Sequence, residues 1–161
     1  MSGDIFLKLD GIQGESADNK HKGEIDVESF HWGVSQPHSL GGGGGGGTGK
    51  ATFNDLNVST HVHKHSAGLQ AACEGGKHIA KGVLVVRKAG EKPQEYLKIT
   101  LTDVLVSSYN LSDHAGGNEL PSESFSLGYS KIEFEYSPQK ADGTLDAATK
   151  SGWDVKANVK L

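Results

Sequence analysis

The sequence predicts an all-β fold, specifically a closed or nearly closed antiparallel β-barrel of about eight strands with one short α-helix. Polar and apolar side chains alternate along most of the 161 residues, and this is the period of a strand rather than of a helix. The chain also contains 23 glycines, which imply many turns. Because no repeat or interdomain linker interrupts this pattern, we expect a single domain over residues 1–161.

In two apolar runs the apolar residues change from odd-numbered to even-numbered positions, and this favours a sheet that bends and closes. Ile25 and Val27 share one parity, whereas Phe30 and Trp32 take the other, and the run over 125–136 changes in the same way. Successive side chains of a strand point to opposite faces, so each change requires a bulge or a corner. A sheet with two such places can curve around on itself.

The other elements follow from the same kind of pattern. A short helix is predicted over about 66–74, with Ser66 as its N-cap and Gly75-Gly76 as its stop. Residues 79–86 are apolar on both parities, which predicts a strand covered on both faces. Three further strands are expected from strict alternation, with inward-facing residues Ile5, Leu7 and Leu9, then Leu97, Ile99, Leu101 and Leu105, and finally Trp153, Val155, Ala157, Val159 and Leu161.

Composition argues against several classes of partner. The formal net charge is -4 and the isoelectric point is near 6.0, which disfavours nucleic acid and anionic membranes. No apolar run is long enough to span a bilayer, so we expect a soluble protein without direct membrane insertion. The first residues, MSGDIFLKLDG, show no secretory signal pattern, and we expect folding in the cytoplasm. Cys73 is the single cysteine, which excludes an internal disulfide.

An unbroken run of seven glycines, Gly41 to Gly47, lies in a predicted loop of about 36–50. The letters GGGGTGK, which end at Lys50, resemble a phosphate-binding loop. That chemistry also needs a hydroxyl where the chain has Ala51, and a helix directly after the loop. The following letters, ATFNDLNV, alternate like a strand. The run therefore predicts a long functional or mobile loop and no nucleotide cofactor.

Three histidines, His61, His63 and His65, are the strongest candidates for catalysis or metal binding. Alternate residues of a strand lie about 6.6 Å apart at Cα, so the outer two are about 13 Å apart and cannot hold one ion together. Their parity instead predicts a solvated polar face, with no metal, no cofactor and no catalytic residue. The alternative is a cupin-like metal enzyme that uses His61 and His63 with ligands from other strands.

Motifs in a fixed order carry a resemblance that runs from the first strand to the last. They are GES (14–16), EIDV (24–27), Trp32-Gly33, the glycine run ending in GK, DL (55–56), GKH (76–78), RKAG (87–90), EYL (95–97), PQKADG (138–143) and GW (152–153). In this order and spacing the chain resembles the haemolysin-coregulated protein (Hcp) family of bacterial type VI secretion. The resemblance implies a β-barrel with one short helix and a structural, secreted protein that is not an enzyme.

The family likeness also implies an assembly. It implies hexameric rings that stack into the inner tube which a contractile sheath expels, with spike and baseplate proteins as further partners and small effector proteins in the lumen. Export of this kind needs no cleaved signal peptide. In such a ring we expect Ser29 and His31 to face the lumen. Ring-to-ring contacts are expected from two loops, at Gly14, Glu15 and Ser16 and at Gly41, Gly44, Gly47 and Lys50.

Overall fold

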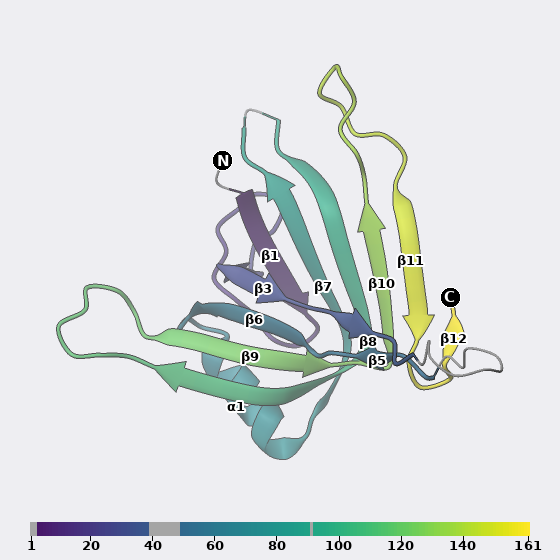
Figure 1. The fold of residues 1–161 in the computed structure, drawn as a ribbon. Coiled ribbons are helices and arrows are strands. Elements are labelled where there is room, and N and C mark those ends of the chain that lie inside the picture. The colour runs from purple at the N-terminus through teal and green to yellow at the C-terminus, as the bar shows by residue number, and fades with distance from the viewer. Residues whose placement is uncertain (1–2, 39–48, 91) are drawn as a thin grey trace.

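The computed structural model describes residues 3–38, 49–90 and 92–161 and is built mainly from antiparallel strands. Figure 1 shows the strands and the single short helix. The elements are β1 (Gly3–Leu9), β2 (Ile25–Val27), β3 (Ser29–His31), β4 (Val34–Ser35), β5 (Thr52–Phe53), β6 (Leu56–His61), α1 (Ser66–Gly75), β7 (His78–Lys88), β8 (Gln94–Ser112), β9 (Ser122–Gly128), β10 (Lys131–Tyr136), β11 (Thr149–Asp154) and β12 (Val159–Lys160).

The expected fold class, mainly antiparallel β with one short helix, is confirmed, but the expected number of strands is too low. The described residues contain twelve strands where about eight were predicted. Several predicted strands divide into shorter ones, because the parity changes interrupt the backbone pairing. The two small strands β4 and β5 pair only with each other in a separate two-stranded sheet.

The long strand β8 organises the main sheet. On one side it pairs with β7 from Gln94 to Leu105. On its other side it pairs first with β10 and then, beyond Thr102, with β9. The strand order therefore branches at β8 into β12-β11-β10 and into β9-β6-β3, while β7-β1-β2 continues from its other side. In Figure 1 the strands around β7 and β10 stand upright, and β3, β6 and β9 run across them.

The bend in β8 has a local cause at Asp103. This residue has a φ of 56°, a left-handed conformation that reverses which face the following side chains occupy. Ile99 and Leu101 are buried before it, and Val104 and Val106 are buried after it. The prediction that Leu105 points inward is therefore wrong, because the shift of parity at Asp103 leaves it only half-buried.

The two parity changes expected from the sequence do interrupt strands. The first falls at Glu28, between β2 and β3, where the Glu28 N–H donates to the Ser59 carbonyl. The second falls between β9 and β10, which pair with successive parts of β8. In both cases the apolar side chains next to the interruption stay on the core face although their numbering changes from odd to even, whereas Tyr136 at the end of β10 is exposed.

The C-terminal strand prediction is wrong. The chain forms β11, turns at 155–158 and returns as β12, which pairs with β11 at Trp153 and Asp154. The turn is held by the Asp154 carboxylate, which accepts a hydrogen bond from the Ala157 N–H, and by Asn158 in a left-handed conformation. Val159 and Leu161 are exposed as a result, so their alternation did not mark a buried face.

The helix lies where the sequence places it. It spans Ser66–Gly75 and ends at Gly76, whose φ of 62° allows its N–H to reach back to the last turn. The N-cap is His65 and not Ser66, which is buried and accepts a hydrogen bond from the His63 N–H. Leu69 and Ala72 turn into the core between the sheets.

Candidate functional site

A four-stranded part of the sheet presents one face with almost no charge. The strands are β3, β6, β9 and the second half of β8, and their register places like side chains beside one another. Phe30, Val58 and Phe125 fill the core face, while serine and asparagine dominate the opposite one. The residues of this polar face are Ser29, His31, Asn57, Ser59, His61, Ser108, Asn110, Ser112, Ser122, Ser124 and Ser126.

Ser29 and His31 both lie on the polar face, and both are exposed. The hydroxyls across the face bond to one another, as between Ser108 and Ser126, whose oxygens are 2.5 Å apart. Charge is confined to the margin, where His61 Nδ1 lies 2.7 Å from a Glu28 carboxylate oxygen. The face can therefore contact a polypeptide without strong ionic or apolar attraction.

A buried ionisable group, Glu123, lies beneath this face. Its carboxylate is 2.5 Å from His65 Nε2 and also accepts a hydrogen bond from the Tyr109 hydroxyl. The His65 and Glu123 side chains are 1% and 0% exposed. Burial acts to raise the pKa of Glu123, but hydrogen bonds from His65, Ser66 and Tyr109 outweigh it, so the pKa is lowered. The expected solvated position of His65 is therefore wrong, because the turn before α1 directs it inward.

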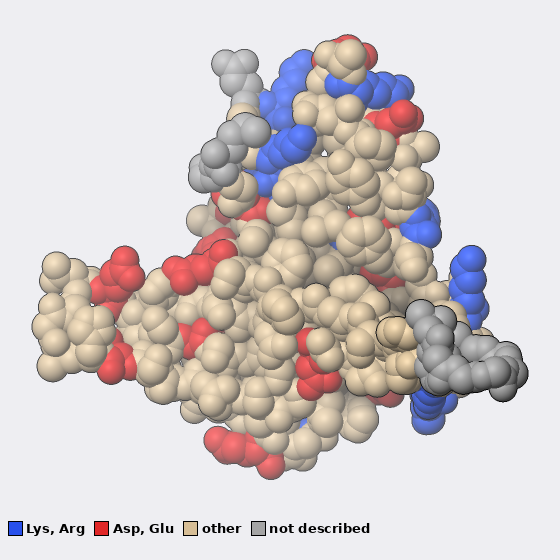
Figure 2. Space-filling view, viewed as in Figure 1, with Lys and Arg blue, Asp and Glu red and all other residues tan. Residues whose placement is uncertain are grey.

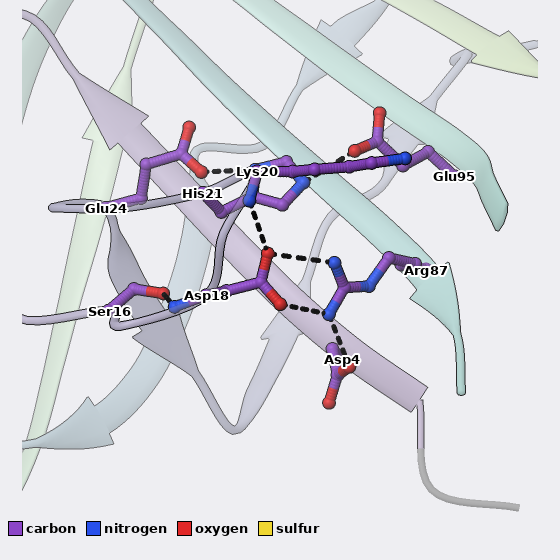
Figure 3. Close-up of polar contacts among 8 residues, drawn as sticks. All are labelled: Asp4, Ser16, Asp18, Lys20, His21, Glu24, Arg87 and Glu95. Atoms are coloured by element: carbon purple, nitrogen blue, oxygen red, sulfur yellow. Dashed lines mark hydrogen bonds and ion pairs between the residues drawn. The ribbon is translucent and has the colours of Figure 1, made fainter. Parts of the chain in front are cut away.

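A second polar cluster fastens the loop of residues 10–24 to the sheet (Figure 3). Arg87 on β7 donates two hydrogen bonds to Asp18 of the loop, 3.0 and 2.6 Å long, and a third to Asp4 of β1. The guanidinium also lies over the Phe6 ring, 4.9 Å from its centroid. The hydrogen bonds from Arg87 lower the pKa of Asp18 from 3.8 to about 2, and they raise that of Arg87.

His21 extends the same cluster. Its ring stacks on Phe6 with the centroids 4.3 Å apart, and its two nitrogens face the carboxylates of Glu24 and Glu95. Because Glu95 comes from β8 and His21 from the loop, this contact joins segments that are far apart in the sequence.

The first predicted stacking loop packs more closely against the rest of the protein than its polar sequence suggests. Gly14 and Ser16 are buried, and their N–H groups donate to the carbonyls of Gly23 and Glu24. A Cβ atom on Gly14 would lie 2.4 Å from the Glu24 carbonyl oxygen, so no larger residue fits. Glu15 alone of the three is exposed. In the second loop Lys50 is exposed, whereas Gly41, Gly44 and Gly47 lie outside the described residues.

The Asp18–Arg87 contact makes a prediction for acid stability. A lowered carboxylate pKa contributes stability that is present above the unfolded value and lost as the pH falls through the folded one. We therefore expect Asp18→Asn to destabilise the protein near neutral pH, with its difference from wild type shrinking between about pH 4 and about pH 2. Urea unfolding at several pH values measures this, with Asp10→Asn as an exposed control. A pH-independent difference would contradict the assignment.

The metal-enzyme alternative gains no support. Among residues 3–38, 49–90 and 92–161 no group of three or more histidine, cysteine or carboxylate side chains is arranged to hold a metal ion. His61 instead faces Glu28 and Glu119, and His63 lies 3.6 Å from Glu15. In the same described residues, no helix is long and apolar enough to cross a membrane.

Sequence reasoning missed the residues that organise both clusters. Arg87 and Asp18 are 69 residues apart, and Glu123 and His65 are 58 apart, so no local pattern joins them. One signal was present for Glu123, because it shares the inward parity of Phe125 and Leu127 on β9. A carboxylate on a core face requires a buried partner.

The fold and the broad polar face define a mainly antiparallel β-protein with an extended surface of hydroxyl and amide side chains. The family model described as "Type VI secretion system effector, Hcp" matches residues 6–136. Protein hcp1 of Pseudomonas aeruginosa is 42% identical over 162 residues, which cover 99% of each chain. The chain therefore belongs to the Hcp family of type VI secretion, whose members are tube-forming secreted proteins and not enzymes.

Solved structures agree with this assignment. A type six secretion system protein superposes with a TM-score of 0.94 at 31% identity, covering 99% of this chain and 100% of that one. Hcp1 from Salmonella typhimurium superposes with a TM-score of 0.82 at 37% identity, and each chain is fully covered. The expected class, a type VI secretion tube protein and not an enzyme, is confirmed by the family.

Proposed function

We propose that this chain forms hexameric rings that stack into the inner tube of a type VI secretion machine, with residues 1–161 acting as one tube domain. Family membership supports a tube component, and the broad polar face is the single observation that supports a lumen. The machine's sheath, spike and baseplate proteins would be its partners. The protein would fold in the bacterial cytoplasm and leave it without a cleaved signal peptide.

Strand connectivity supports a closed barrel as the building block of the ring. β2 and β3 are one chain segment interrupted only at Glu28. Because β2 pairs with β1 and β3 pairs with β6, this segment joins the two ends of the path β1-β7-β8-β9-β6. A closed path of this kind removes the free strand edges that would otherwise pair without control.

The polar face is suited to line a lumen. In this arrangement Ser29 and His31 point into the channel with the other serines and asparagines of the face. Uncharged hydroxyls and amides remain hydrated and give a passing effector little to adhere to. The experiment that tests the function is the mass of the purified protein together with negative-stain microscopy. Rings with an open centre are expected, and a clean monomer would contradict the proposal.

His31 provides a prediction for cargo. We expect His31→Asp to leave rings intact but to change the retention of lumen-bound effectors, because it places six carboxylates on a face that is otherwise uncharged. Co-purification of an effector with rings measures the effect. Ala71→Asp, which places one carboxylate at an exposed position of α1, is the matched control. Unchanged retention by intact His31→Asp rings would exclude a lumen position.

The two predicted stacking loops remain part of the proposal. In the first loop Glu15 has the exposed side chain, while Gly14 and Ser16 would shape the backbone that presents it. In the second loop we propose that Gly41, Gly44 and Gly47, with Lys50, contact the next ring. If a glycine-rich loop became ordered when rings stack, this ordering would cost conformational entropy. The cost would weaken the stacking of free rings, so that tubes would form only where the secretion machine starts their assembly.

Shortening the glycine run tests this role. We expect removal of four of the seven glycines to leave ring mass unchanged and to reduce tube formation and secretion. Sedimentation measures the mass of the rings, microscopy measures tube formation, and a secretion assay measures the amount of protein exported. A variant that replaces the same four glycines with serine keeps the loop length as a control. Normal tubes from the shortened protein would show that this loop does not mediate stacking.

A further inference from the structure

Lysine and arginine are absent from the part of the chain that builds the polar face. The strands of this face lie within residues 28–38, 51–63 and 103–130, and these segments contain none of the 16 lysines and arginines. Figure 2 shows acidic atoms and no basic atoms on the projecting hairpin of β8 and β9, whereas basic atoms gather over the upright strands. The positive charge of the molecule is therefore segregated from the polar face.

Carboxylates stand at two margins of the same face. At one margin His61 lies between Glu28 and Glu119, whose oxygens are 2.7 and 3.4 Å from its two ring nitrogens. At the other end of β6, Asp55 accepts a hydrogen bond from the Ser107 hydroxyl. The Glu28 and Glu119 side chains are 57% and 85% exposed, so their other lone pairs are open to a ligand. Within the described part of the chain, none of the three carboxylates pairs with a lysine or arginine.

A hollow of about 310 Å³ opens in the polar face next to Glu28. Its lining includes Ser59, Ser124 and Asn110, which the strand register places side by side across β6, β9 and β8. Hydroxyl and amide oxygens accept hydrogen bonds, and the Glu28 carboxylate adds a negative charge to the same lining. No lysine or arginine among the residues that the structure describes borders the hollow. Its chemistry suits the ammonium or guanidinium group of a long side chain.

From this one-sided charge distribution we propose that the polar face selects polypeptide cargo with a basic surface, and that a lysine or arginine of the cargo enters the hollow beside Glu28. The inference rests on the proposed lumen and names the class of cargo that it takes. In a ring each carboxylate recurs once per copy, and charges of one sign around a cleft attract ligands of the opposite sign. The uncharged serines and asparagines between them keep each contact weak, so a basic cargo is concentrated in the channel and can still move along it.

Binding of two short peptides tests this selection. One peptide contains serine and lysine, and the other contains serine and glutamate; they have the same length and the same dye. Each is titrated with the purified protein, and fluorescence anisotropy measures the dissociation constant. We expect the lysine peptide to bind more tightly at low salt. The difference should shrink as salt is added, because exposed charges are screened beyond about 10 Å at 0.1 M ionic strength. Equal binding of the two peptides at low salt overturns the proposal.

Matched variants locate the binding site, because the formal net charge of the whole chain is also negative. We expect Glu28→Gln to weaken binding of the lysine peptide about two- to fivefold, which is the range for one exposed ion pair. Glu133→Gln removes an exposed carboxylate from β10, which takes no part in the polar face, and should leave binding unchanged. Asn110→Lys places a cation in the hollow and should weaken binding at least as much as Glu28→Gln. Ala71→Lys, at an exposed position of α1, is its control.

The outcomes separate cargo selection from the assembly itself. Equal losses in the polar-face variants and in their controls would mean that overall charge attracts the peptide, and the proposal is then wrong. Rings that show no preference between the peptides also overturn the selection, but they leave the proposed tube function in place. A monomer that binds the lysine peptide through Glu28 supports the selection and contradicts the ring.

Discussion

Replacing Glu123 with alanine is expected to reduce the free energy of unfolding by about 3–5 kcal/mol. The substitution removes the carboxylate that bonds both to His65 and to the Tyr109 hydroxyl inside the protein. Loss of one member of a buried pair leaves the other desolvated and without compensation. Urea unfolding followed by circular dichroism measures the change.

Glu28→Ala is the matched control for that experiment. It also removes a glutamate from a contact with a histidine, His61, but the Glu28 side chain is 57% exposed. Exposed pairs contribute at most about 1 kcal/mol, because water replaces the lost partner. Similar losses for the two variants would mean that the Glu123 pair is not desolvated in solution.

Gly14→Ala is expected to destabilise the protein by about 1–3 kcal/mol, although it adds one methyl group. The new Cβ would lie within 3.0 Å of three backbone atoms of Glu24 and Ile25, and backbone cannot turn aside as a side chain can. The loop would have to move away from β2 and would weaken the contacts that Asp18 and His21 make with the sheet.

The control for Gly14→Ala is Gly75→Ala at the end of α1. A Cβ there meets no atom within 4 Å, and alanine is about 0.5–1 kcal/mol better than glycine in a helix. Thermal unfolding should therefore move in opposite directions for the two variants. A neutral result at Gly14 would show that this loop does not pack on β2 as described.

Local pattern predicted the parts of the fold that local geometry decides. The helix ends at Gly76, where the backbone adopts a left-handed conformation that glycine favours. The change from odd to even apolar positions near Glu28 corresponds to the interruption between β2 and β3. The polar positions of Ser29 and His31 could be predicted for the same reason, since they alternate with Phe30 on one strand.

Features that leave no mark in the alternation of polar and apolar residues could not be predicted in this way. The alternation over residues 153–161 is equally consistent with a strand and with a hairpin, and the bonds around Asp154 decide between them. Nothing in the sequence indicates that Asp103 adopts a left-handed backbone conformation. The residues predicted to face inward after it are therefore one position away from those that do. The Arg87 cluster requires knowledge that the loop returns to β7.

The branching of strands at β8 has a mechanical consequence. The hydrogen-bond ladders to β7, β9 and β10 all end on this one segment, so the upright strands and the crosswise strands share a continuous covalent backbone. A push delivered to one sheet reaches the other as tension or compression along β8, without relying on side chains that can slide past one another. In the proposed tube, where a sheath would push the subunit forward, this junction would transmit the load between the two groups of strands.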